Sequence, residues 1–237
     1  MAGAYFYELV IRHTKASCDQ DHIDVVISGR ASTPDRTAFI VGASSENPLG
    51  QMRADAERLI AYGADVLAMP CNTAHYFYDR LHESLSVPLI NIIEVTVARV
   101  LESGCTKVGI MATEGTVSTH TYQKCCTAHK LPCEVPSREG QARLNNIIYG
   151  DIKTGGAPDM DSFRTVEREL VSRGCDRIIL GCTELSLIKK SYNLGALYVD
   201  SLETLAFAAI KACGKEVTGY TPGDKITEDS HNYGIII

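Results

Sequence analysis

The stretch Ala61-Tyr62-Gly63-Ala64-Asp65 leads through an apolar run to Cys71, and Ser172-Arg173-Gly174-Cys175-Asp176 leads through another to Cys182. In both, the glycine precedes the aspartate by two residues and the cysteine by eight. A polar pair and then a segment of helical period follow each cysteine. Two copies of one helix-strand-turn plan predict a duplicated protein whose halves have the same build.

Apolar runs bounded by glycine or proline alternate with helical patterns along the whole chain, which is typical of parallel α/β proteins. We predict an α/β fold of two pseudo-symmetric lobes, each with a parallel sheet of four-stranded type, around a central cleft. In this prediction residues 1–100 and 201–237 form the first lobe, and residues 101–200 form the second. The strands are expected at 23–28, 65–69, 89–93, 107–112, 177–180 and 196–199.

The two halves differ at their beginnings. The second half opens with the strand 107–112, followed by a helix over 115–129, whereas the first half opens directly with a helix over 4–14. The strand that matches 107–112 should then precede Met1. We therefore expect the first strand of the first lobe to be missing, and the stretch from Thr218 onward to be an irregular tail.

Composition excludes several classes of function. The chain has 237 residues and a net charge of −6, with its lysines and arginines scattered, so it lacks the basic footprint of a nucleic-acid-binding protein. No apolar run approaches the roughly 20 residues of a membrane span, and the first residues do not resemble a secretion signal. We expect a cytoplasmic protein without a membrane or nucleic-acid partner, in which most of the nine cysteines are free core residues.

Cys71 and Cys182 do not fit that description, because each stands between a strand and a helix and is followed by polar residues. The carboxyl edge of a parallel sheet is where ligands bind, and a helix start stabilises an anion such as a thiolate. Two thiols facing each other across a cleft suit the inversion of a stereocentre, which needs a base on one face of the carbon and an acid on the other. Their proton affinities should be coupled.

The segments 70–75 (Pro-Cys-Asn-Thr-Ala-His) and 181–185 (Gly-Cys-Thr-Glu-Leu) resemble the two signatures of the aspartate/glutamate racemase family, aspartate racemase branch. The resemblance also runs through 19–22, 34–37, 111–116 and 149–153. It implies two similar lobes, often in a homodimer, and racemisation of aspartate or glutamate without pyridoxal phosphate or metal. It further implies that Cys71 and Cys182 are the proton donor and acceptor. Family members usually begin with a strand and a glycine-rich loop that this chain lacks before Met1.

The resemblance makes Arg36 the cation that binds the side-chain carboxylate of the substrate, and Lys153 a second carboxylate ligand. Without it, both would be solvated loop residues. Asn72, Thr73 and Thr183 stand at helix starts, where they can cap the helix, bind the α-carboxylate of the substrate, or do both. Glu184 is a candidate for keeping the Cys182 thiol protonated. The full set of expected substrate-binding residues is Arg36, Asn72, Thr73, Ala74, Thr113, Thr116, Lys153, Thr183 and Glu184.

Several alternatives remain open. His75 could pair with the Cys71 thiol, although a packing histidine is the simpler interpretation. The cluster His120, Cys125, Cys126, His129 and Cys133 could hold zinc, but its spacing lacks paired cysteine knuckles, and we expect no metal. In place of a racemase, the chain could be a maleate-type isomerase or a decarboxylase of the same superfold, or an inactive dicarboxylate-binding relative.

Overall fold

Two parallel sheets of four strands each form the framework of the protein. The computed structural model describes residues 2–192, 194–219 and 235–236. The first sheet has the strand order β1-β8-β2-β3 and the second the order β5-β4-β6-β7, with parallel pairing throughout. The strands of the first sheet are β1 (Val25–Val26), β8 (Ile235–Ile236), β2 (Val66–Ala68) and β3 (Leu89–Ile90). Those of the second are β5 (Cys133–Glu134), β4 (Val108–Ala112), β6 (Arg177–Gly181) and β7 (Tyr198–Asp200).

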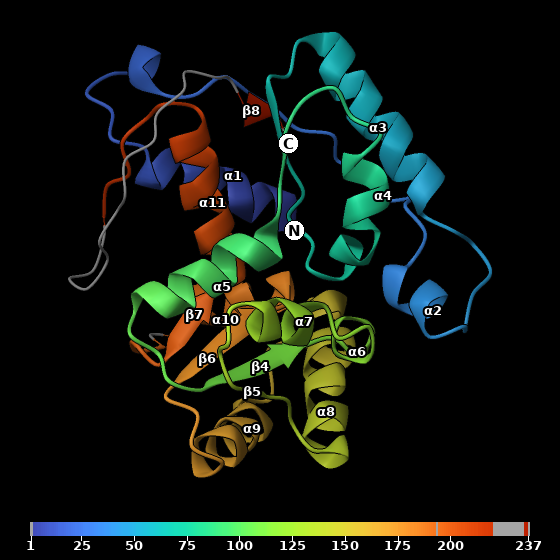
Figure 1. Cartoon of the computed structure of the whole chain (residues 1–237), viewed down its shortest axis with the longest axis vertical. Helices are drawn as coiled ribbons and strands as arrows, with labels where there is room; N and C mark the ends of the chain where they lie inside the picture. Colours follow the sequence, from blue (N-terminus) through green and yellow to red (C-terminus); the bar gives the residue numbers. More distant parts are fainter. Residues whose placement is uncertain (1, 193, 220–234, 237) are drawn as a thin grey trace.

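The helices surround the two sheets in separate groups. In Figure 1 the helices α1, α3, α4 and α11 lie in the upper part, α2 lies at the right beside α6, and α7 to α10 lie with the second sheet below. The α-helices are α1 (Ala2–His13), α2 (Arg36–Ile40), α3 (Leu49–Tyr62), α4 (Tyr78–His82), α5 (Ile92–Glu102), α6 (Glu114–Ser118), α7 (Thr121–Ala128), α8 (Arg138–Asn145), α9 (Met160–Ser172), α10 (Thr183–Ser191) and α11 (Ser201–Ala212). Short helical turns are η1 (Asp19–Asp21), η2 (Thr73–Phe77) and η4 (Ile152–Thr154), and η3 (Asn146–Asp151) is a π-helix. No helix in the described part of the chain is long and apolar enough to cross a membrane.

The repeated glycines have a structural reason. Gly63 follows α3 with φ 117°, and Gly174 follows α9 with φ 88°. This left-handed conformation ends a helix and turns the chain toward the next strand, and glycine adopts it without a steric penalty. The strands β2 and β6 then run to Cys71 and Cys182 at corresponding places. The parallel α/β fold and the six predicted strands are confirmed.

Two expectations about local structure were wrong. The predicted helix over 115–129 is broken into α6 and α7 at His120, whose φ of 55° is left-handed and interrupts the helical hydrogen bonds. The stretch from Thr218 onward, expected to be irregular, contains strand β8, while residues 220–234 and 237 lie outside the described residues. β8 lies between β1 and β2, at the place of the strand that we expected before Met1.

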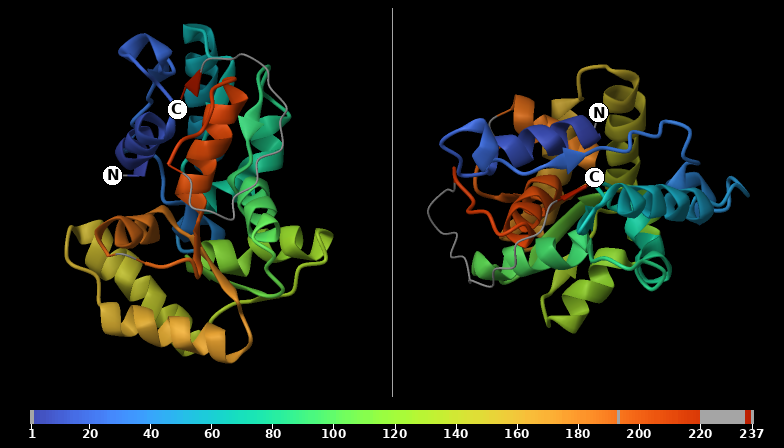
Figure 2. Two further views of the ribbon diagram at one scale, coloured as in Figure 1. Left: turned by 90° about the vertical axis from the view of Figure 1, so that its left-hand side faces the viewer. Right: turned by 90° about the horizontal axis from the view of Figure 1, so that it is seen from above.

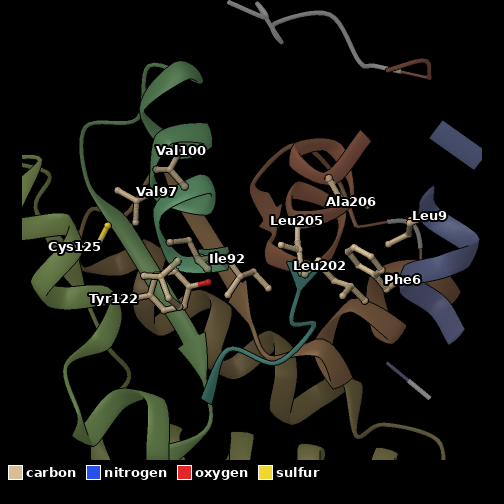
Figure 3. Packing of buried hydrophobic residues seen from close by; sticks show 14 of the residues in the cluster. Phe6, Leu9, Ile92, Val97, Val100, Tyr122, Cys125, Leu202, Leu205 and Ala206 are labelled. Atoms are coloured by element: carbon tan, nitrogen blue, oxygen red, sulfur yellow. The ribbon is translucent and has the colours of Figure 1, made fainter. Parts of the chain in front are cut away.

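A shared hydrophobic core joins the two sheets. In Figure 3, Phe6 and Leu9 of α1 face Leu202 and Leu205 of α11, and the side chains of α5 and α7 extend the same cluster. Ala68 of β2 belongs to it, as do strand residues of β4 and β6. Figure 2 shows α11 and α5 running side by side between the two sheets. This core holds the carboxyl edges of β2 and β6 in a fixed relation.

Candidate active site

A cavity of about 450 Å³ is lined by residues that directly follow strands of both sheets. Cys71 follows β2 and Cys182 follows β6, and both line it. The turns after β1 and β4 contribute Arg36 and Thr113. A neighbouring cavity of about 300 Å³ shares Arg36 and Cys71 but is otherwise largely apolar. The carboxyl ends of parallel strands thus meet at one cavity, as expected for an α/β protein.

Cys182 is held as a thiol. It is 5% exposed, stands just before α10 with an extended backbone, and donates a hydrogen bond from Sγ to Glu184 Oε2 at 2.9 Å. Burial raises the pKa of Cys182 well above its ordinary value, and the negative charge of Glu184 raises it further. The expected lowering of the Cys182 pKa by the helix start is therefore outweighed. The hypothesis that Glu184 keeps this thiol protonated agrees with the contact.

Cys71 has a different environment. It is half-buried, and the chain continues into the 3-10 turn η2, so that the α-helix α4 begins only at Tyr78. The expected α-helix start at Cys71 is thus absent, and with it most of the dipole of a full helix. The guanidinium of Arg36 provides positive charge at Cys71 in place of the helix dipole. The interaction with Cys71 is the main cause of the raised pKa of Arg36. The sulfur of Cys71 therefore lies beside the guanidinium of Arg36.

Arg36 is positioned by the start of α2. The side chain of Asp35 caps this helix by accepting a hydrogen bond from the Ala38 amide at 2.8 Å. Arg36 Nη1 donates to the carbonyl of Pro34 at 3.1 Å, which anchors the half-buried guanidinium on its own loop. The planar guanidinium can offer paired donors to a carboxylate in the cavity.

Tyr149 is a cavity residue whose role we did not predict. Its hydroxyl donates to Thr37 Oγ1 at 2.8 Å, and Lys153 Nζ lies 4.2 Å from the centre of its ring. Burial raises the pKa of Tyr149 to about 12, so its hydroxyl stays protonated. It stands four residues before Lys153, across the end of the π-helix η3, and π-helical turns are frequent at functional sites. The four-residue spacing between Tyr149 and Lys153 was the feature of the sequence that could have placed Tyr149 at the site.

Three threonine hydroxyls meet between the two halves. Thr73 Oγ1 lies 2.8 Å from Thr113 Oγ1 and 3.1 Å from Thr116 Oγ1. Thr73 and Thr113 line the cavity, whereas Thr116 is fully buried behind them and Ala74 lines the neighbouring apolar cavity. The structure therefore brings seven of the nine expected binding residues to this cavity, namely Arg36, Asn72, Thr73, Thr113, Lys153, Thr183 and Glu184.

Asn72 belongs to a buried hydrogen-bond chain that connects the two cysteine turns. It accepts from the Tyr122 hydroxyl at 2.6 Å and donates to Ser201 Oγ at 2.9 Å. The Ser201 hydroxyl donates to the carbonyl of Leu180, two residues before Cys182, at 2.8 Å. The side chain of Asn72 therefore does not cap a helix, as we had considered, and neither do those of Thr73 and Thr183, which bond to other side chains.

His75 contacts the backbone of Cys71 rather than its sulfur. Its Nε2 accepts a hydrogen bond from the Ile92 amide at 3.1 Å, so Nδ1 carries the proton and donates to the Cys71 carbonyl at 2.9 Å. Burial lowers the pKa of His75 to about 4. The ring is a neutral packing group that joins the Cys71 turn to the start of α5.

The residues that the structure brings together as possible metal ligands differ from those of the zinc hypothesis. Among the described residues, the potential ligand atoms that lie within 4.8 Å of one another belong to Glu94, Cys125 and His129. Cys125 and His129 belong to the predicted cluster, but His120, Cys126 and Cys133 are not in this group. Glu94 and His129 are exposed and bond directly to each other at 3.1 Å. This group lies outside the cavity of the two cysteines.

Comparisons with known proteins show which proteins the chain is similar to. The family model described as Asp/Glu/Hydantoin racemase matches residues 1–209. The chain is 26% identical over 155 residues to the broad specificity amino-acid racemase RacX of Bacillus subtilis, covering 65% of this chain and 67% of that protein. It is 28% identical over 167 residues to a glutamate racemase of Desulforudis audaxviator, covering 66% of this chain and 60% of that one. The structure of the Picrophilus torridus aspartate racemase matches with a TM-score of 0.77 at 27% identity, covering 92% of this chain and 91% of that one.

Proposed function

The chain belongs to the Asp/Glu/Hydantoin racemase family, and from this premise we propose that it inverts the α-carbon of an acidic amino acid, aspartate foremost, without a cofactor. Cys71 and Cys182 are the acid and base of this proposal. The observation that carries it is that both cysteines line one cavity while their neighbours have opposite charges, Arg36 at Cys71 and Glu184 at Cys182. A racemase needs such a pair, one sulfur without a proton and one with it.

In the proposed reaction the Cys71 thiolate removes the α-proton from one enantiomer, and the Cys182 thiol gives its proton to the opposite face of the same carbon. Cys71 then holds the proton and Cys182 is the thiolate. The opposite enantiomer reacts with this form by the reverse steps. Alternatively, proton exchange with water restores the starting form, which Arg36 and Glu184 stabilise.

Cations in the cavity favour an acidic substrate. The guanidinium of Arg36 is proposed to bind the side-chain carboxylate in a two-to-two pairing, with Lys153 as a second cation. The hydroxyls of Thr73 and Thr113 and the amides that follow the two cysteines are proposed to bind the α-carboxylate. These groups would stabilise the negative charge that spreads from the α-carbon as the proton leaves.

The test is incubation of the purified chain with L-aspartate in D2O, followed by NMR and chiral chromatography. A racemase replaces the α-proton with deuterium and forms D-aspartate, and the reverse experiment with D-aspartate gives the L form. L-Glutamate and an apolar amino acid define the specificity. The double variant C71S/C182S is the control for contaminating racemase.

Other outcomes distinguish the alternatives. Fumarate formed from maleate would identify a cis-diacid isomerase, and released carbon dioxide would identify a decarboxylase. Binding of aspartate without exchange of the α-proton would identify an inactive dicarboxylate-binding relative, and each of these results would reject the racemase.

We also expect a homodimer that acts in the cytoplasm. Light scattering of the purified chain checks the dimer.

A further inference from the structure

Strand β8 occupies in the first sheet the place that β4 occupies in the second. β4 lies between β5 and β6, and β8 lies between β1 and β2. The residue pairing of β8 with β2 matches that of β4 with β6. Val66 and Arg177 stand at the same place in the repeat, three residues after the glycine, and they pair with Ile235 and Val108 respectively. β8 is thus the counterpart of β4, although it is separated from the other strands of its half by the whole second half of the chain.

A helix of each half also reaches the cavity. In the second half, β4 leads into α6, whose N-cap Thr113 lines the cavity. In the first half the first helix is α1, and its residues Ala2 and Gly3 line the same cavity. Each half thus has a helix at the cavity, α1 through Ala2 and Gly3 and α6 through its N-cap Thr113.

β8 also pairs with both β1 and β2, the two strands of the first sheet that lead to active-site residues. Within the described residues β1 pairs with β8 alone, and β2 pairs with β8 and β3. β1 leads to the loop that carries Arg36, and β2 leads to Cys71. The sheet spacing between these two strands is set by the backbone hydrogen bonds of β8. The two residues of β8, Ile235 and Ile236, are β-branched, as expected of a strand at the centre of a parallel sheet.

We propose that the C-terminal strand β8 is a positioning element of the active site, which holds Arg36 in register with Cys71 by serving as the central strand of the first sheet of its own chain. Its effect on turnover rests on the proposed racemase function. Its effect on the Arg36–Cys71 contact does not, and can be measured without substrate.

Hydrogen exchange of the wild-type chain tests the placement directly. If β8 is inserted between β1 and β2, the amides of Ile235 and Ile236 are protected from exchange, and their protection does not change with protein concentration. Exchange at the rate of an unfolded peptide would overturn the proposal. Protection that falls on dilution would also overturn it, because the strand would then come from a second copy of the chain.

A truncated chain without residues 231–237 and the variant Ile235→Pro test the consequence for the site, with Ile235→Val as the matched control. Proline removes a ladder donor, whereas valine keeps the strand chemistry. We expect slower alkylation of Cys71 near pH 7, unchanged alkylation of Cys182, and a KM for aspartate raised about 10- to 100-fold, as a misplacement near 1 Å can produce. A synthetic peptide of residues 230–237 should restore part of the Cys71 alkylation rate of the truncated chain.

Two results would separate this proposal from the function on which it partly rests. If no variant racemises any amino acid, the alkylation rates and exchange data still decide whether β8 positions Cys71. If the truncated chain keeps the Cys71 alkylation rate and the KM of the wild type, β8 does not position the site, whatever the reaction is. Should the truncated chain fail to fold, the wild-type exchange measurement still decides the placement.

Discussion

The turns at Cys71 and Cys182 share a backbone plan but have opposite electrostatics. Each follows a short parallel strand that begins after a left-handed glycine. Cys71 is half-buried next to the guanidinium of Arg36, whereas Cys182 is buried and bonded to the carboxylate of Glu184. The two turns follow similar courses, but the sulfur of Cys71 has a cation as its neighbour and the sulfur of Cys182 has a carboxylate.

The residue four positions after each cysteine makes a similar structural contact in both halves but with a different side chain. In the first half it is His75, which accepts from the amide of Ile92 at the start of α5. In the second half it is Ser186, which donates to Asp200, the N-cap of α11, at 2.6 Å. Both side chains connect the cysteine turn to the helix that follows the next strand. The titratable groups in these contacts are His75, whose pKa is lowered, and Asp200, whose pKa is raised.

The largest expected effect comes from removing either thiol. In Cys71→Ser and in Cys182→Ser, racemisation of aspartate should fall about 10²- to 10⁴-fold, because one proton transfer loses its acid or base. Each variant should retain slow deuterium exchange without inversion, and the two variants should do so with opposite enantiomers. The measurement is NMR of each enantiomer in D2O. Exchange with the same enantiomer in both variants would break the assignment of the two sulfurs to opposite faces.

The pH dependence of stability should differ in sign between the two helix starts. Burial lowers the pKa of His75 to about 4 from 6.5, so its contribution to stability is present above pH 6.5 and is lost as the pH falls toward 4. Burial raises the pKa of Asp200 to about 6 from 3.8, so its contribution is present at low pH and is lost as the pH rises through 6. Each contribution is about 3 kcal/mol.

Urea unfolding of the wild type, His75→Gln and Asp200→Asn between pH 4 and 7 measures these two contributions. Relative to the wild type, His75→Gln should flatten the loss of stability on acidification, and Asp200→Asn should steepen it. Equal slopes in all three proteins would show that neither group titrates differently in the folded and unfolded states.

Replacing Arg36 should affect substrate binding less than removing a thiol affects turnover. Arg36→Leu loses charge-assisted hydrogen bonds of about 1.5–3 kcal/mol, which corresponds to a KM for aspartate raised roughly 10- to 150-fold. Arg36→Lys should recover only part of this, because an ammonium cannot pair two-to-two with a carboxylate. Steady-state kinetics with aspartate and with an apolar amino acid provide the measurement. A KM that rises equally for both would exclude Arg36 as the side-chain carboxylate ligand.

The smallest effect is expected for Glu184→Gln. The amide keeps the shape of the side chain but removes the charge that raises the pKa of Cys182, so alkylation of this thiol should move to lower pH. The ratio of the kcat values for the two enantiomers should change about fivefold, which corresponds to ~1 kcal/mol, with a matching change in the ratio of their KM values. Glu139→Gln, at an exposed site on α8, is the control. An unchanged alkylation profile of Cys182 would leave burial as the only cause.

The sequence predicted local features well and relations between distant segments less well. The glycine-to-cysteine echo predicted β2, β6 and the meeting of both cysteines at one cavity, because strand polarity follows from local pattern. The central place of β8 depends on which segment fills the gap between β1 and β2, and three consecutive isoleucines do not reveal their partner strands. The break at His120 was missed because helical periodicity does not report a single left-handed residue. The division into residues 1–100 with 201–237 and residues 101–200 remains a prediction.

The buried path from Tyr122 through Asn72 and Ser201 to the Leu180 carbonyl has a consequence for folding cooperativity. Each of its members would be left with an unsatisfied polar group if one half opened while the other stayed intact, at a cost of about 1–3 kcal/mol per group. The duplicated halves should therefore melt together in a single calorimetric transition, and neither should persist as an autonomous intermediate.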